Sequence, residues 1–296
     1  MNKPELDFIV IGAIKAATTW LQAQLQHHPD IAIPEIEPHF FTREYDRGWK
    51  WYSSLFPATK KPGTLWGEKT ADYLAKPEAA ERISRIYPDA KLILQLRNPV
   101  DRAYSDYKML YRRGTVTGPP EDYLKSLDNP FPRFLHDGLY AQHLRRWLEL
   151  FPRENILVFT FEDVRTRPEQ TLVAVYDHLG AQPLVESEIV ARKFNNSSEQ
   201  LLPLPLRKIL TPFKPIARPF RNSAIFRRTH AQFAKEMVYP PLSGELRKSL
   251  AGFYSRDVED LGKMLDRDLS TWIAPDLDGE HSRVTDSRFR RTALIA

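Results

Sequence analysis

The residues with the clearest chemical potential lie near the start of the chain, in the stretch LDFIVIGAIKAATTWLQAQL (residues 6–25). β-Forming residues lead to Gly12, small residues surround Lys15, and apolar residues at helical spacing follow Thr19. A strand, a tight turn and a helix N-terminus direct backbone N–H groups and the positive end of a helix dipole at one point. Because a lysine in this turn adds a full charge, the segment predicts a site for a phosphate or sulfate group.

This turn differs from two common phosphate-binding patterns. A Walker A loop ends in Gly-Lys followed by Ser or Thr, whereas Lys15 lies three residues after Gly12, and Thr18 and Thr19 follow without such a pair. A dinucleotide-binding fingerprint needs three glycines, and Gly12 stands alone. The predicted anion site is therefore of another type.

A second segment with chemical potential is LILQLRNPVDRAYSDYKM (residues 92–109). Arg97 follows a continuous apolar run typical of a buried strand, and open α/β sheets bind ligands at that end of their strands. Ser105 lies on the helix that follows, so a guanidinium and a hydroxyl converge in a way that suits a phosphate monoester. The alternative is that Arg97 pairs with Asp101 or Asp106 and only ties the helix to the sheet.

The elements that must position these residues alternate between strand and helix. This order predicts an α/β fold, a single domain with a central, mostly parallel sheet flanked by helices. We expect the domain to span residues 1–274, with an irregular Pro-rich insertion at 201–242 and a disordered tail at 275–296. The expected strands after the first are 65–68, 91–96 and 155–160, and the expected helices are 49–56, 77–87, 99–113, 137–151 and 168–179, with a last helix capped by Ser243.

Composition limits the classes of protein to which the chain can belong. It has 296 residues and no cysteine, which excludes disulfides and thiolate metal sites. Its histidines show no metal-ligand spacing, so we expect no metal. The N-terminus lacks the apolar core of a signal peptide and no segment has the length of a membrane span, so we predict a soluble, cytoplasmic protein.

The net charge of +5 is unevenly distributed. Residues 201–235 contain eight basic and no acidic side chains, which leaves about −3 on the remainder of the chain. Such a segment favours an anionic glycan, a nucleotide or peripheral contact with an anionic membrane, and the alternative is a solvated loop. Nucleic acid is not expected as a partner because the rest of the chain is acidic. The sequence leaves the oligomeric state open.

The two segments together resemble the sulfotransferases that use 3′-phosphoadenosine-5′-phosphosulfate. Lys15-Ala16-Ala17-Thr18-Thr19 is similar to the family's loop for the 5′-phosphosulfate, and Arg97 with Ser105, 82 residues beyond Lys15, to its 3′-phosphate pair. Glu37-Pro38-His39-Phe40-Phe41 and Gly67-Glu68-Lys69-Thr70 resemble segments of the heparan-sulfate-type (glycan) enzymes and their bacterial cytoplasmic relatives. The resemblance covers about residues 6–200 and, weakly, the final helix at 244–272, and it implies a P-loop-like nucleotide-binding fold.

This resemblance implies in-line transfer of a sulfuryl group to a hydroxyl (or amine) of a carbohydrate or glycolipid, without a metal. Lys15 would stabilise the charge that grows on the bridging oxygen. Glu37 is the expected general base, His39 is its competitor, and a third alternative is that Glu37 merely pairs with Lys69. Lys69 is either a second clamp on the sulfate or a surface lysine. The implied nucleotide-binding residues are Lys15, Ala16, Ala17, Thr18, Thr19, Trp20, Arg97, Ser105, Asn196 and Ser197.

The chain departs from the family's pattern at Ala17, where glycine is usual. Alanine adopts a positive φ with difficulty, so we expect Ala17 to be right-handed helical. Two other functions stay open from the sequence. One is a P-loop-type small-molecule or nucleotide kinase, and the other is a non-catalytic binder of adenine nucleotides or anionic glycans.

Overall fold

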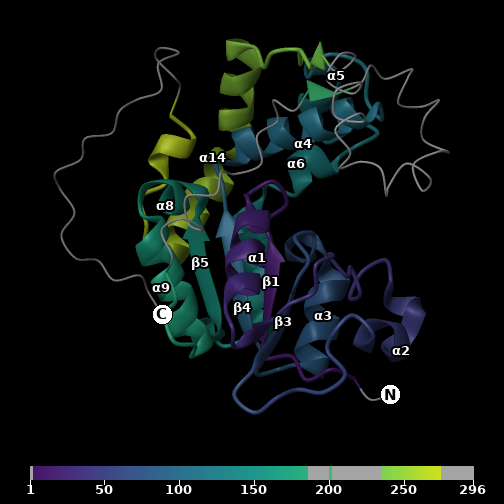
Figure 1. Cartoon of the computed structure of the whole chain (residues 1–296). Coiled ribbons are helices and arrows are strands. Elements are labelled where there is room, and N and C mark those ends of the chain that lie inside the picture. The colour runs from purple at the N-terminus through teal and green to yellow at the C-terminus, as the bar shows by residue number, and fades with distance from the viewer. Residues whose placement is uncertain (1–2, 186–199, 202–234, 275–296) are drawn as a thin grey trace.

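The computed structural model describes residues 3–185, 200–201 and 235–274. Within them, five parallel strands form one sheet in the order β2-β3-β1-β4-β5 (Figure 1). The strands are β1 (Phe8–Gly12), β2 (Ile31–Ala32), β3 (Leu65–Lys69), β4 (Lys91–Leu96) and β5 (Ile156–Thr160). The predicted α/β class and parallel sheet are confirmed.

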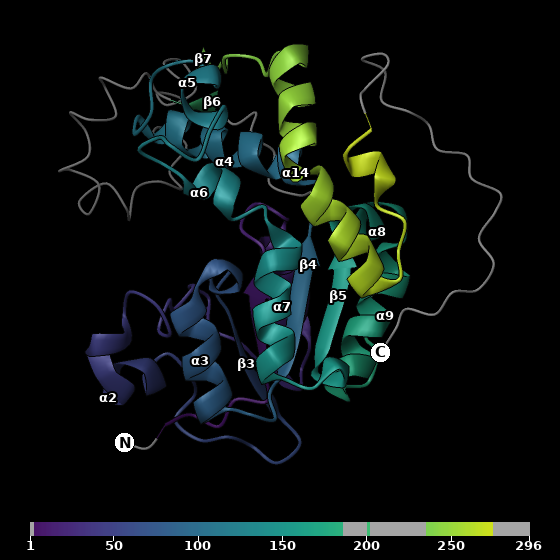
Figure 2. The same cartoon turned by 180° about the vertical axis from the view of Figure 1, so that it is seen from behind.

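Helices cover both faces of the sheet. In the described part of the chain the α-helices are α1 (Thr18–His27), α2 (Gly48–Ser53), α3 (Pro77–Ile86), α4 (Pro99–Arg113), α5 (Glu121–Leu124), α6 (Arg133–His136), α7 (Tyr140–Leu150), α8 (Phe161–Thr166), α9 (Pro168–Leu179) and α14 (Gly244–Leu265). Helices α1 and α9 lie on the face seen in Figure 1, and α3 and α7 lie on the other face, seen in Figure 2. The result is a three-layer sandwich, the usual solution for a parallel sheet.

The alternation of β1 explains the two apolar layers. Phe8 and Val10 pack with α1 and α9, whereas Ile9 and Ile11 pack with the cluster that includes α3 and α7. Successive side chains of a strand point to opposite faces, so one short strand contributes to both cores. Gly67, opposite Phe8 in the register, leaves room for the Phe8 ring, because a Cβ at Gly67 would lie 2.3 Å from it.

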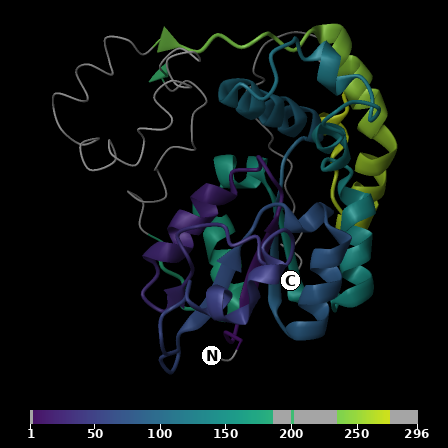
Figure 3. The same ribbon diagram turned by 90° about the vertical axis from the view of Figure 1, so that its right-hand side faces the viewer.

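Helix α4 lies across the carboxyl ends of the strands (Figure 3). Asn98 caps it by accepting hydrogen bonds from the backbone N–H groups of Val100 and Asp101, and Pro99 occupies its first position, as the sequence predicts. The Asn98 side chain also donates to the carbonyl of Trp272, at 3.1 Å. The last described segment is therefore attached to the same end of the sheet.

Two predictions on organisation fall partly or wholly outside the described residues. The tail 275–296 lies outside them, as does most of the insertion 201–242, although Gln200–Leu201 (β6) pairs antiparallel with Lys235–Glu236 (β7). A short ladder thus joins the two ends of the basic segment, and the irregular course expected between them stays a prediction. Among the described helices, none combines the length and apolar character that crossing a bilayer requires. Cytoplasmic location stays a prediction.

Candidate active site

The turn after β1 leaves the first N–H groups of α1 without a cap. Lys15 and Ala17 both have a φ of 67°. The N–H of Ala16 donates to the carbonyl of Ala13, and no side chain caps α1. The N–H groups of Ala17, Thr18 and Thr19 have no acceptor among the described residues, so this helix N-terminus is available to an anion.

The left-handed conformation of Ala17 contradicts the expectation that this residue is right-handed helical. Its φ and ψ are 67° and 26°, the region in which glycine is favoured. The chain must reverse sharply between Gly12 and Thr18, and Ala17 is the residue that makes the final reversal into α1. An alanine there costs about 1–2 kcal/mol relative to a right-handed position.

Replacing Ala17 with glycine should therefore stabilise the fold. The strain relieved, about 1–2 kcal/mol, exceeds the extra entropy of the unfolded glycine chain, about 0.4–1 kcal/mol, and we expect a net gain of about 0.5–1 kcal/mol. Urea denaturation of Ala17→Gly against wild type measures this gain. Ala16→Gly is the matched control, because Ala16 has no positive φ and should lose stability. A loss at position 17 equal to that at position 16 would contradict the strain.

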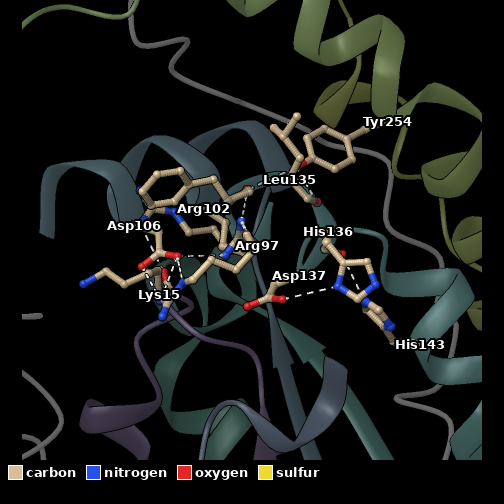
Figure 4. Close-up of polar contacts among 11 residues, drawn as sticks. Lys15, Arg97, Arg102, Asp106, Leu135, His136, Asp137, His143 and Tyr254 are labelled. Carbon is tan, nitrogen blue, oxygen red and sulfur yellow. Dashed lines mark hydrogen bonds and ion pairs between the residues drawn. The ribbon is translucent and has the colours of Figure 1, made fainter. Parts of the chain in front are cut away.

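Arg97 reaches the same turn from the neighbouring strand β4. Its guanidinium donates from Nη1 to the Lys15 carbonyl at 3.3 Å (Figure 4). It also lies 5.0 Å from the centre of the Phe161 ring. The alternative pairing of Arg97 with Asp101 or Asp106 is wrong. Asp101 pairs with Arg247 at 2.9 Å, and Asp106 accepts a forked pair of hydrogen bonds from Arg133. Arg97 therefore keeps donors for a ligand.

Ser105 lies two turns along α4 and is half-buried. Its hydroxyl makes no hydrogen bond with the described part of the chain, so it too is available to a ligand.

The electrostatic surroundings of Lys15 favour an anion. Burial lowers the pKa of Lys15, Asp106 opposes this effect, and Arg112, Arg97 and Arg113 lower the pKa further. Burial also lowers the pKa of Lys108, on the same helix as Ser105, and Arg97 adds to that effect. Several cations held close together in a partly dehydrated site attract a multiply charged anion.

On the other side of β1, Glu37 and Lys69 form an ion pair. The Lys69 ammonium, 2% exposed, donates to Glu37 Oε1 at 2.5 Å, and the Ala71 N–H donates to Glu37 Oε2 at 3.2 Å. Lys69 is thus buried, and the surface-lysine alternative is wrong. The pairing that the third alternative expects is present, and Glu37 still exposes 32% of its side chain.

His39 joins this group through Asp72. Its Nδ1 lies 2.9 Å from Asp72 Oδ1, which leaves Nε2 facing Glu37 Oε2 at 4.0 Å. His39 has a φ of 50°, and its N–H donates to Thr70 Oγ1 at 3.2 Å. Sequence reasoning missed Asp72. Its signal was the position three residues after Lys69, in the turn that leaves β3.

Three further residues were predicted to bind the nucleotide, namely Trp20, Asn196 and Ser197. The side chain of Trp20 is buried in the core cluster of α1 and α9, its backbone N–H donates to the Ala17 carbonyl, and its contact with a nucleotide stays a prediction. Asn196 and Ser197 lie outside the described residues. No cluster of three potential metal ligands occurs in the part of the chain that the structure describes.

Comparison with known proteins adds independent findings. The model of the sulfotransferase domain matches residues 5–201. The mouse heparan sulfate glucosamine 3-O-sulfotransferase 6 is 38% identical over 184 residues, covering 60% of this chain and 53% of the relative. The mouse bifunctional heparan sulfate N-deacetylase/N-sulfotransferase 3 is 30% identical over 298 residues, covering 91% of this chain and 31% of the relative. The chain spans about half the length, or less, of these curated relatives.

A solved structure also matches over most of the chain. The sulfotransferase from Alicyclobacillus acidocaldarius superposes with a TM-score of 0.65 and 26% identity, covering 91% of this chain and 99% of that one.

Proposed function

The chain belongs to the sulfotransferase domain family, and we propose that it transfers the sulfuryl group of 3′-phosphoadenosine-5′-phosphosulfate to a carbohydrate hydroxyl. The observation that carries the proposal is the hydrogen bond from Arg97 to the carbonyl of Lys15, 82 residues away in the sequence. It joins the two predicted anion-binding corners at adjacent strands, β1 and β4. The Glu37–Lys69 pair lies beyond β1, at β3.

The residues present fit such a nucleotide. Lys15 and the free N–H groups of Ala17, Thr18 and Thr19 would hold the 5′-phosphosulfate. Arg97 and Ser105 would hold the 3′-phosphate. Since both corners carry unpaired donors and are surrounded by cations, they match a ligand with anionic groups at two ends.

The reaction breaks the bond between sulfur and the bridging oxygen of the phosphosulfate and forms a bond between sulfur and the acceptor oxygen. The departing phosphate oxygen gains negative charge, which Lys15 and the α1 N-terminus would stabilise. The acceptor hydroxyl would lose its proton to Glu37, whose side chain is 32% exposed although Lys69 and the Ala71 N–H each donate to one of its oxygens. Asp72 would orient His39 beside that carboxylate.

A carbohydrate acceptor is supported by the heparan sulfate relatives, which include both 3-O-sulfotransferases and N-sulfotransferases. The Glu37 carboxylate favours the hydroxyl, because a neutral amine attacks without prior proton removal. Incubation with labelled sulfate donor and a panel of glycans, amino sugars and glycolipids tests the assignment. Label found only on a glycolipid or only on an amine would contradict the carbohydrate hydroxyl as the acceptor.

Substitution of Arg97 tests the nucleotide site. Arg97→Ala should weaken binding of 3′-phosphoadenosine 5′-phosphate about 10–100-fold, because charged hydrogen bonds contribute about 1.5–3 kcal/mol. It should leave the binding of adenosine 5′-phosphosulfate, which lacks the 3′-phosphate, much less affected. Calorimetry measures both, with the exposed Arg85 on α3 replaced by alanine as control.

The same titration separates the alternative functions. Tight binding of ATP with magnesium, and none of the bisphosphate, would favour the kinase, which the family match disfavours. Tight bisphosphate binding without transfer to any acceptor would favour the non-catalytic binder.

A further inference from the structure

A buried acid, Glu68, lies next to Lys69 but points the other way. In the register of the sheet Glu68 lies opposite Ile9, and Lys69 lies opposite Val10. Ile9 belongs to the core cluster that contains Tyr52 and Tyr73, whereas Val10 belongs to the other cluster. Glu68 therefore projects into an aromatic core, where it is 0% exposed, while its neighbour forms the ion pair with Glu37.

Glu68 has no cation beside it in the described chain. Neither of its carboxyl oxygens has a hydrogen bond of normal geometry, and it forms no ion pair within the described residues. The polar groups that act on it are the hydroxyls of Tyr52 and Tyr73 and, as further negative charges, Asp72 and Glu37. Burial is the main cause that raises the pKa of Glu68 to about 8. An ionised carboxylate there would lack compensation.

The core around Glu68 supports the segment that carries Glu37 and His39. The Tyr73 hydroxyl, one of the groups that act on Glu68, accepts a hydrogen bond from the Phe41 N–H at 3.1 Å. The rings of Tyr52 and Tyr73 each lie 5.7 Å from that of Phe41. We call the rings of Phe41, Tyr52 and Tyr73 the aromatic floor. Because Phe41 follows His39 by two residues, a change in the packing of this floor reaches the segment that carries Glu37 and His39.

We propose that Glu68 is a positioning residue held as a neutral carboxylic acid, and that its ionisation loosens the aromatic floor under Glu37 and His39. The titratable groups facing it are Tyr52 from α2, Tyr73 and Asp72 from the turn after β3, Tyr87 after α3, and Glu37. The two carboxylates are already negative and the tyrosines are neutral or become negative as the pH rises, so none of these groups compensates the new charge. The link to activity rests on the proposed sulfate transfer.

The sign of the pH effect follows from the pKa of Glu68. Its folded value of about 8 exceeds its ordinary value of 4.5, so the folded state binds more protons than the unfolded state between these values. The contribution of this raised pKa to the free energy of unfolding is fully present below pH 4.5 and is lost as the pH rises to about 8. Glu68→Gln mimics the neutral acid and should escape this loss.

Two measurements on the full chain test the neutral acid without any substrate. Infrared difference spectra at pH 7 should show the carbonyl band of a protonated carboxyl group in wild type and not in Glu68→Gln. Melting temperatures between pH 5 and pH 9 should diverge, with Glu68→Gln gaining on wild type as the pH rises. Glu78→Gln, at an exposed position on α3, is the control with the same charge change and should stay parallel to wild type. A missing band or parallel melting curves would overturn the proposal.

The activity profile tests the positioning role. Above pH 8 the wild-type kcat for labelled-sulfate transfer should fall, and the fall should be smaller in Glu68→Gln. Identical alkaline limbs would overturn the positioning role. If no acceptor takes sulfate but the infrared band is present, the proposed function fails and the neutral acid stands.

Discussion

Replacing Lys15 with alanine should lower the rate of sulfate transfer about 10²–10³-fold, the usual loss when one donor to a developing oxyanion is removed. Lys15 is the cation on the turn itself, and in the proposed mechanism its ammonium stabilises the oxygen that gains charge as the bond to sulfur breaks. Nucleotide binding should fall less than turnover, because Arg97, Arg112 and Arg113 remain as cations around the site.

Single-turnover kinetics and calorimetry with 3′-phosphoadenosine 5′-phosphate separate these two effects. Lys61→Ala removes an exposed lysine from the segment before β3 and serves as the control for net charge. Near-normal turnover in Lys15→Ala would remove this residue from the mechanism. Equal losses in binding and turnover would assign it to ground-state binding alone.

The strands and helices that carry the proposed nucleotide-binding residues were predictable because their sequence signals are local. The run KLILQL is continuous and apolar and is strand β4 with the predicted bounds, and the Asn98-Pro99 start and the end at Arg113 define α4. The helix Pro168–Leu179 ends at Gly180, whose φ of 70° is that of a C-terminal glycine. In each case one or two residues fix the boundary without help from distant parts of the chain.

The features that sequence reasoning missed depend on tertiary contacts. Strand β2 has two residues, too few for any periodicity, and it forms by pairing with β3. Helix α8 is the exception, because it begins directly after β5 through a local capping box of Thr160 and Asp163 that the sequence already contains. The left-handed Ala17 follows from the path between β1 and α1. The burial of Glu68 follows from its pairing with Ile9 of β1. The alternation of side chains along a strand does not by itself predict which face packs against the aromatic cluster.

The site residues also fall into those that local sequence signals predicted and those that depend on tertiary contacts. Residue types at fixed spacing indicated Lys15, Arg97, Glu37 and Lys69. Their placement at the same end of the sheet follows from the parallel order β3-β1-β4, because the carboxyl ends of these strands are adjacent. Asp72 was missed because its role depends on the His39 ring, which lies 33 residues away in the sequence.

Replacing Glu37 with glutamine should lower turnover about 10²–10⁴-fold, the range for loss of a general base. The amide keeps an oxygen that can accept from the Lys69 ammonium but cannot take the acceptor's proton. His39→Asn is the matched test of the competitor, because asparagine tolerates the positive φ of position 39 better than alanine. We expect a smaller loss of turnover in this variant, since the proposed role of His39, oriented by Asp72, is to support the Glu37 carboxylate beside it.

Asp72→Asn completes the comparison, because it removes the charge that orients His39 while leaving Glu37 and Lys69 paired. If Glu37 is the base, Asp72→Asn and His39→Asn should lose similar amounts, and the loss should not increase when the two are combined, as for residues acting in one unit. Full activity in Glu37→Gln together with a large loss in His39→Asn would assign the base to the imidazole. In that case Asp72 would be the group that holds its Nε2 toward the acceptor, and the Glu37–Lys69 pair would be structural.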